Sequence, residues 1–145
     1  MNMIKRINHM AIVAPDLDAA TGFWAEALGL PVTRIEDVPA EGVRVAFLPV
    51  GESNIELLQP TDAESGVARY LEKRGPGMHH VCLEVDDIDA ALARLKAANV
   101  PLINDEARAG HGGTRYAFIH PKGTGGVLIE LYELAADGSA ADGSG

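Results

Sequence analysis

The chain is short of several residue types, and each shortage excludes a class of protein. It has one cysteine, Cys82, so no disulfide can form within the chain. Its 12 lysines and arginines face 21 acidic residues, a net charge of −9, which argues against nucleic acid as a partner because phosphate binding needs clustered cations. No apolar run approaches the roughly 20 residues that cross a bilayer. We therefore expect neither a nucleic-acid nor a membrane partner.

The length and the two ends of the chain set further expectations. With 145 residues, the chain is long enough for one compact domain with a real core. Residues 1–7 lack the apolar stretch of a signal peptide, and a single cysteine is usual in a reducing compartment, so we expect a cytoplasmic location. The small and polar segment 135–145 is expected to be disordered. The expected domain covers residues 1–134.

An internal repeat is the clearest positive signal. His9 and His80 lie 71 positions apart in similar apolar runs, and Asp16 and Asp87 keep the same spacing. Ile55-Glu56-Leu57 returns as Ile129-Glu130-Leu131 after 74 positions, so three residues are inserted between the two points. A repeat of this length indicates two modules that share one core. We place them at about 5–60 and 77–134.

Each module is expected to fold in the order β-α-β-β-β. Apolar runs bounded by glycine and proline predict the strands, and amphipathic spacing after Asp16 and Asp87 predicts the helices. The first module has expected strands at 7–14, 31–37, 42–50 and 54–59 and a helix at 17–28. The second has strands at 79–85, 101–105, 114–120 and 126–133 and a helix at 87–98. A short helix is expected within the connecting segment 61–73.

The alternation of side chains along the strands places four polar residues on one side of the sheet. Successive side chains of a strand point to opposite faces. Apolar neighbours such as Leu57 and Val81 therefore pack beneath the helices, and the polar residues face the other way. These residues are His9, Glu56, His80 and Glu130.

Two imidazoles and two carboxylates form the donor set of a metal site. This set suits a borderline divalent ion such as Co²⁺, Ni²⁺, Mn²⁺ or Zn²⁺, and it leaves coordination positions open for a substrate. Taken singly, each residue is more simply explained as a hydrogen-bonded or solvated side chain. Their matching register in both modules favours the metal site, with His9, Glu56, His80 and Glu130 as ligands.

Other chemically notable residues receive simpler interpretations. Cys82 is expected to line the same face as His80 but to act as a small buried residue, since no partner would make it a nucleophile. His79 has the opposite parity and is interpreted as a packing residue. The glycine clusters at 110–113 and 123–126 do not open a helix after a strand, so we expect tight turns rather than phosphate loops.

Two stretches carry a resemblance to a known family. They are residues 73–80 (KRGPGMHH) and residues 120–131 (HPKGTGGVLIEL). With the first histidine strand, they resemble the vicinal-oxygen-chelate superfamily and, within it, the methylmalonyl-CoA epimerases, over almost all of residues 5–133. The resemblance implies an α+β fold of two tandem βαβββ modules that form a curled mixed sheet around a metal site. It also implies one divalent metal ion per chain, a CoA thioester substrate and a homodimer.

The activity implied by the resemblance is metal-dependent epimerisation of (2R)- and (2S)-methylmalonyl-CoA. The C2 proton is removed to give an enediolate and is returned on the other face, which requires two acid–base groups. The family pattern is broken at Val45, where some members carry a glutamate taken as the second base. Glu56 stands where some epimerases have glutamine. We therefore expect Glu130 and Glu56 to be the catalytic residues.

Two alternatives share the fold. The set His9-Glu56-His80-Glu130 is similar to that of bacterial glyoxalase I, but residues 120–122 read His-Pro-Lys where glyoxalases usually have Asp-Pro-Asp. A non-catalytic small-molecule-binding protein of the bleomycin-resistance type is the second alternative. Such binders generally lack the full set of four residues, which counts against this interpretation.

Overall fold

The computed structural model describes residues 3–135, and these form two compact units. Unit one contains the described residues up to His9 and from His80 onward, and unit two contains Met10–His79. Strand β1 (Ile4–Val13) contributes its first part to unit one and its last part to unit two. Apart from residue 135, the segment predicted to be disordered lies outside the described residues. The single-domain boundary at residue 134 stays a prediction.

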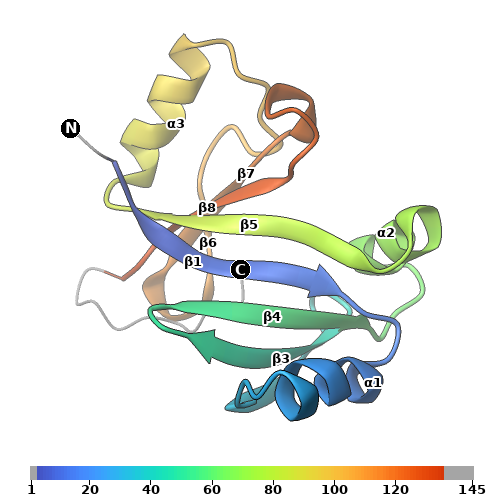
Figure 1. Ribbon diagram of the computed structural model, residues 1–145. Coiled ribbons are helices and arrows are strands. Elements are labelled where there is room, and N and C mark those ends of the chain that lie inside the picture. The colour runs from blue at the N-terminus through green and yellow to red at the C-terminus, as the bar shows by residue number, and fades with distance from the viewer. Residues whose placement is uncertain (1–2, 136–145) are drawn as a thin grey trace. The chain divides into compact units, whose positions relative to one another are not determined.

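Unit two combines a sheet, whose last three strands pair antiparallel in chain order, with two α-helices (Figure 1). Its strands follow the order β2-β3-β4-β1. The elements are helix α1 (Leu17–Thr21), π-helix η1 (Gly22–Ala27), strands β2 (Arg34–Val38), β3 (Val43–Val50) and β4 (Ser53–Pro60), and helix α2 (Gly66–Arg74). The side chain of Asp16 caps α1 by accepting hydrogen bonds from the backbone N–H groups of residues 18 and 19.

The two faces of the unit-two sheet differ as the strand alternation predicts. Leu57 and its neighbours Ala46 and Leu48 pack with Leu17 of α1, in a cluster that also includes Trp24. Glu56 points to the opposite face, directly across from Phe47. That face also carries a buried apolar cluster of Ala11, Val43, Val45, Phe47 and Leu58. We call the sheet face that carries Glu56 in unit two, or Glu130 in unit one, the glutamate face.

Unit one is a mixed sheet covered on one face by a helix (Figure 1). Its strands follow the order β1-β5-β8-β7-β6, with β5 parallel to β8 and the outer pairs antiparallel. The elements are β5 (Gly77–Val85, of which residues 80–85 belong to this unit), α3 (Ile88–Ala97), β6 (Arg108–Ala109), η2 (His111–Gly113), β7 (Arg115–Ile119), η3 (Pro121–Gly123) and β8 (Ile129–Glu133).

Helix α3 is fixed at its start and along its apolar side. Asp87 caps it by accepting from the N–H of residue 90, and the N–H of Ile88 donates to a carboxylate oxygen of Glu133 on β8 at 2.9 Å. Leu92 and Ile88 pack onto Leu131 in the unit-one core. The face of the sheet beneath α3 is therefore filled by apolar side chains, and Glu130 points to the other face.

The prediction of a strand at 101–105 was wrong. Only an isolated bridge between Leu102 and Ile119 forms there. Pro101 has no N–H to donate, and the side-chain oxygen of Asn104 accepts from the N–H of Phe118 at 2.8 Å, in place of a backbone carbonyl. The short strand β6, at residues 108–109, pairs with β7 instead.

The helix predicted at 17–28 is present but changes type. Its regular part ends at Thr21, and the next six residues, from Gly22, form a π-helix. Gly22 has more backbone freedom than other residues, which eases a change of helix type at this point. π-turns occur as local insertions in α-helices. The predicted α+β class with a mixed sheet is confirmed. Within residues 3–135, the structure has no helix long and apolar enough to span a membrane.

Candidate metal centre

Three of the four predicted ligands meet in unit one. Strand β1 presents His9, β5 presents His80 and β8 presents Glu130. The register explains why they share a face: Cys82, two residues after His80, lies directly opposite Glu130 in the parallel β5–β8 pair. All three side chains are buried, with exposed fractions of 6% or less. Strand pairing alone therefore brings two imidazoles and a carboxylate together out of water.

The distances between their atoms fit a bound ion. His80 Nε2 lies 3.2 Å from His9 Nε2 and 3.2 Å from Glu130 Oε1, and His9 Nε2 lies 3.4 Å from the same oxygen. Two nitrogen or oxygen donors at 2.0–2.2 Å from one tetrahedral ion are about 3.3–3.6 Å apart. The three donor atoms thus have nearly the mutual spacing that a shared metal requires.

The proton on His9 is placed away from the centre. His9 Nδ1 lies 2.8 Å from the side-chain oxygen of Asn8. An amide oxygen only accepts, so Nδ1 carries the proton and Nε2 of the neutral ring keeps its lone pair. Histidines that bind metals usually have their other ring nitrogen held in this way. Asn8 was not singled out from the sequence, because its spacing carries no signal beyond its place beside a histidine.

The charges at the centre also suit a cation. Burial lowers the pKa of His9 and favours the neutral ring. Burial alone raises the pKa of Glu130, but the His80 and His9 rings beside the carboxylate outweigh it and hold this pKa at about 2. The carboxylate is close to both rings but poorly aligned, so neither oxygen makes a hydrogen bond of normal geometry with a described residue. A buried anion beside a neutral imidazole is the state that metal binding needs.

Cys82 joins this centre more closely than its predicted role implied. Its side chain is fully buried, as expected. Its sulfur, one ring nitrogen of His9 and one carboxylate oxygen of Glu130 all lie within 4.8 Å of one another. The thiol is therefore close enough to these donor atoms to contact an ion that they bind.

Glu56, the fourth predicted ligand, lies in unit two. It is 2% exposed on the glutamate face of β4 and stands opposite Phe47 on β3. Glu130 stands opposite Phe118 on β7 in the same manner. The repeat is thus kept in the immediate surroundings of both glutamates. Coordination by Glu56 stays a prediction.

The remaining histidines have local structural roles. His79 packs edge-on against Tyr70, with ring centroids 4.9 Å apart, as its parity predicted. His120 Nδ1 accepts from the N–H of Lys122 and caps the η3 turn. His111 lies in the exposed turn η2. Both glycine clusters form turns next to strands, as expected.

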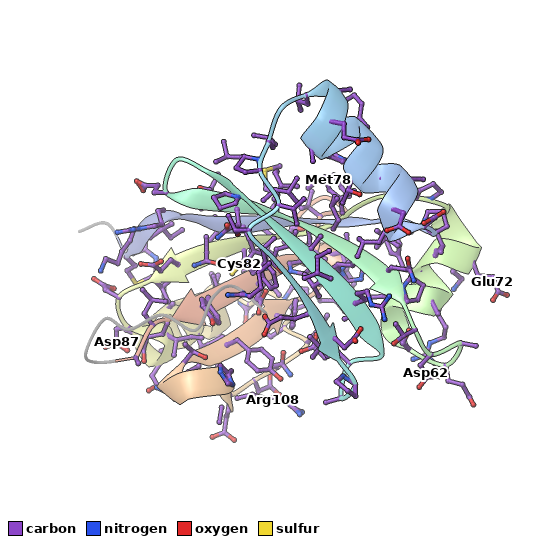
Figure 2. The ribbon with its side chains drawn as sticks, turned by 90° about the horizontal axis from the view of Figure 1, so that it is seen from below. Asp62, Glu72, Met78, Cys82, Asp87 and Arg108 are labelled. Atoms are coloured by element: carbon purple, nitrogen blue, oxygen red, sulfur yellow. The ribbon has the colours of Figure 1, made fainter. Side chains whose placement is uncertain are left out.

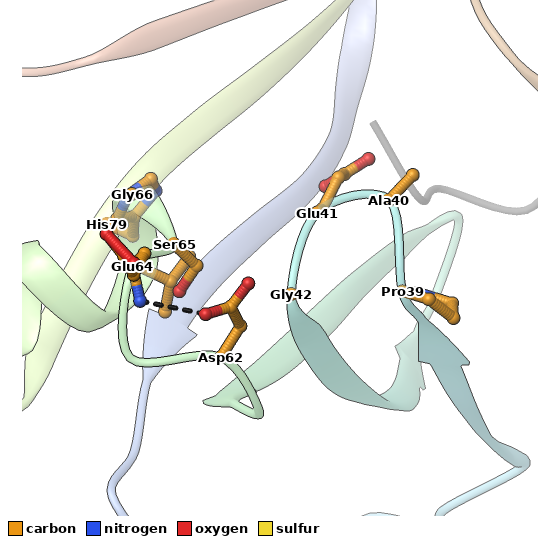
Figure 3. A pocket seen from close by; sticks show the side chains of 10 residues that line it. Pro39, Ala40, Glu41, Gly42, Asp62, Glu64, Ser65, Gly66 and His79 are labelled. Atoms are coloured by element: carbon orange, nitrogen blue, oxygen red, sulfur yellow. Dashed lines mark hydrogen bonds between the residues drawn. The ribbon is translucent and has the colours of Figure 1, made fainter.

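A surface pocket lies in unit two, between the 39–42 turn and the start of α2 (Figure 3). It has a volume of about 480 Å³ and is lined by the carboxylates of Glu41, Asp62 and Glu64. Gly42 keeps the turn close to the helix: it has a φ of 67°, and a Cβ there would come within 2.8 Å of Ser65. None of the described residues that line this pocket is a lysine or an arginine, so it is poorly suited to a polyanionic ligand.

Comparisons with known proteins show the family of the chain. The Glyoxalase/Bleomycin resistance protein/Dioxygenase superfamily matches residues 8–118. Methylmalonyl-CoA epimerase, mitochondrial, of Mus musculus is 42% identical over 129 residues, which cover 88% of this chain and 72% of that protein. Ethylmalonyl-CoA/methylmalonyl-CoA epimerase of Cereibacter sphaeroides is 42% identical over 134 residues, 91% of this chain and 100% of that protein. A probable lactoylglutathione lyase of Vibrio cholerae is 28% identical over 128 residues, 88% and 90% of the two chains.

Solved structures give the same result. Methylmalonyl-CoA epimerase from Mycobacterium tuberculosis aligns with a TM-score of 0.83 at 38% identity and covers 93% of this chain and 91% of its own. A variant of the Streptomyces coelicolor epimerase, in complex with 2-nitronate-propionyl-CoA, aligns with a TM-score of 0.82 at 38% identity and covers 92% and 96%. The chain therefore belongs to the methylmalonyl-CoA epimerase family of the glyoxalase, or vicinal-oxygen-chelate, superfamily.

Proposed function

We propose that this chain interconverts (2R)- and (2S)-methylmalonyl-CoA with the help of one divalent metal ion. The observation that carries the proposal is the buried His9-His80-Glu130 cluster, with donor atoms 3.2–3.4 Å apart. It occurs in a chain that is 42% identical to named epimerases over most of its length. The proposed ligands are His9, Glu56, His80 and Glu130, which suit Co²⁺, Ni²⁺, Mn²⁺ or Zn²⁺.

Glu130 is the proposed first base. When bound, the ion supplies Lewis-acid stabilisation of the charge that develops on the substrate oxygens as C2 loses its proton. The low pKa of Glu130 keeps its side chain ionised at neutral pH. Its Oε2 has no hydrogen-bond partner among the described residues, so that oxygen can accept the C2 proton.

Glu56 is the proposed second acid–base group. Epimerisation requires that a proton leave one face of C2 and that another arrive on the opposite face. Val45, on the glutamate face of unit two, cannot carry a proton, whereas Glu56 is a buried carboxylate on the same face, on the adjacent strand β4. In one turnover Glu130 gains the C2 proton and protonated Glu56 gives one up. Exchange with solvent or the reverse turnover restores both groups.

The CoA thioester, the homodimer and the cellular location belong to the same proposal. A relative solved with 2-nitronate-propionyl-CoA supports a CoA thioester as the substrate class. A homodimer stays a prediction, which light scattering on the purified protein tests. A cytoplasmic location also stays a prediction, and the Mus musculus relative is named mitochondrial.

Glyoxalase I activity is the alternative that the donor set favours. The probable lactoylglutathione lyase of Vibrio cholerae is 28% identical to this chain, whereas the Mus musculus epimerase is 42% identical. The His120-Pro121-Lys122 turn before β8 also differs from the usual glyoxalase sequence. The full set of ligands counts against a non-catalytic binding protein.

The experiment that separates these functions measures two reactions on one preparation. In D₂O, the metal-loaded protein is expected to exchange the C2 proton of methylmalonyl-CoA, detected by mass spectrometry. It is expected to form no lactoylglutathione from methylglyoxal and glutathione. Lactoylglutathione formation without C2 exchange would reverse the ranking, and the absence of both reactions would favour the binding protein.

A further inference from the structure

Cys82 stands among the metal ligands without a role in the proposed reaction. It shares the face of His80, two residues along β5, and lies directly opposite Glu130 on β8. Its side chain is fully buried, and Figure 2 labels it near the middle of the view, whereas the label of Asp87 lies at the edge. The sulfur lies within 4.8 Å of donor atoms of His9 and Glu130. A thiol at this position can reach an ion held by those two residues.

The repeat shows that the fold does not require a thiol there. The position 71 residues earlier is Ala11, which is also fully buried and packs in the apolar cluster of unit two. A methyl group therefore suffices at this place in a module. The sulfur is an addition to the glutamate face of unit one, next to the charged centre.

A second feature of the centre calls for a cation on that face. Glu130 is fully buried, and its Oε2 has no hydrogen-bond partner among the residues that the structure describes. Two donors on one tetrahedral ion, one of them sulfur at about 2.3 Å, are roughly 3.5 Å apart. The Cys82 sulfur and the donor atoms of His9 and Glu130 are now at most 4.8 Å apart. A shift of about 1 Å or a rotation of the thiol is therefore enough to bring all three within bonding distance of one ion.

We propose that Cys82 is an alternative ligand that captures thiophilic ions, so that the centre has two binding modes. Harder ions such as Mn²⁺ use the imidazole and carboxylate donors. Soft ions such as Cd²⁺, and Co²⁺ in part, are bound by Cys82 with His9 and Glu130. Thiolate ligands select soft metals, which gives the two modes different ion preferences. The S–H proton passes to the buffer as the metal–sulfur bond forms, so no oxidant or reductant is needed.

This inference rests on the proposed metal centre, and the test separates the two. Metal-free protein is titrated with Co²⁺, and the near-ultraviolet spectrum is recorded for the natural chain and for Cys82→Ala, which installs the side chain of the other module. The natural chain is expected to show a thiolate-to-cobalt charge-transfer band that Cys82→Ala lacks. Dissociation constants for Cd²⁺ and Mn²⁺ are then measured by calorimetry on both proteins.

The two ions are expected to respond differently to the substitution. Cys82→Ala is expected to weaken Cd²⁺ binding at least about tenfold and to leave Mn²⁺ binding within about twofold, and the Mn²⁺ value also reports that the variant is folded. The absence of the charge-transfer band in cobalt-loaded natural protein overturns the inference even if Cys82→Ala does not fold. Equal Cd²⁺ affinities overturn it while the metal centre stands. If neither Cd²⁺ nor Mn²⁺ binds the natural chain, the metal centre itself is wrong.

Discussion

The glutamate faces of the two units are repeats of one pattern with different contents. Both keep a buried glutamate opposite a phenylalanine, Glu130 with Phe118 and Glu56 with Phe47. Around this pair, unit two carries more apolar side chains than unit one, together with Arg34, whose guanidinium lies 4.0 Å from the Phe47 ring. The unit-two residues Ala11, Val45 and Leu58 correspond by the repeat to unit-one residues that bear polar groups, Cys82, Tyr116 and Tyr132.

The repeat thus keeps the same frame in both units, while the side chains around it differ. Unit one gathers donor atoms: two imidazoles and a carboxylate whose close approach out of water calls for a cation. Unit two carries one buried carboxylate on a face that also holds a buried apolar cluster and the Arg34 guanidinium. We propose that Glu130 acts as a base within the donor cluster of unit one and that Glu56 supplies the second acid–base group from unit two.

The largest expected effect comes from changing the two glutamates in turn. Glu130→Gln and Glu56→Gln each keep an oxygen ligand and hence much of the metal affinity, but each removes a proton acceptor. Both are expected to slow epimerisation by about 10²–10⁴-fold, because positioned proton transfer contributes that much. Steady-state rates with each metal-loaded variant check this. If Glu56→Gln keeps the natural rate, the glutamate of unit two is no base, and the proton comes from another group.

The histidines give the next largest effect. His9→Ala or His80→Ala removes a neutral nitrogen ligand and is expected to weaken metal binding at least about 100-fold in calorimetric titrations. The matched control is His79→Ala, since His79 adjoins His80 in sequence but packs on Tyr70. The control is expected to bind metal normally. Unchanged affinity in both ligand variants would disprove the centre in unit one.

Asn8 is expected to have a smaller effect on the same measurement. Asn8→Leu removes the oxygen that holds the proton of His9 on Nδ1 at 2.8 Å, and we expect a loss of about 10–100-fold in metal affinity. Asn8→Asp keeps an acceptor at that place and is expected to recover most of the loss. Identical affinities for Asn8→Leu and the natural chain would show that the tautomer is fixed by something else.

The last and weakest effect concerns the exposed ion pairs made by two arginines at repeated positions. Arg115 binds Asp89 through two bonds of 2.8 Å, and its repeat counterpart Arg44 binds Asp37 at 2.8 Å. Hydrogen bonding to Arg115 lowers the pKa of Asp89. The resulting stabilisation is present above the unfolded pKa, about 3.9, and is lost as pH falls through the lower folded value.

Urea unfolding of Arg115→Met across pH tests this sign. The variant is expected to be slightly less stable than the natural chain near pH 6, and the difference is expected to vanish in strong acid and to shrink with salt. Arg44→Met serves as the comparison in the other unit. A difference that grows as the pH falls would contradict the assigned cause.

The sequence predicted much of the fold and of the centre because both rest on periodicity. Strand alternation placed His80 and Glu130 on the face opposite Leu131, and the observed register confirms it. The irregular path of residues 101–105 was not predictable by pattern, since the side chain of Asn104 replaces a backbone bond. The closeness of the Cys82 sulfur depends on the parallel pairing of β5 with β8, which alternation alone does not give.

One measurement tests the central claim most directly, namely that a single metal ion held by this chain drives proton exchange at C2 of methylmalonyl-CoA. Metal-free protein is titrated with Co²⁺ or Mn²⁺ in D₂O, and the rate of deuterium incorporation at C2 is followed. The rate is expected to rise linearly, to level off at one ion per chain and to fall to background when a chelator is added. A full rate without metal, or one that a chelator leaves unchanged, would contradict the account.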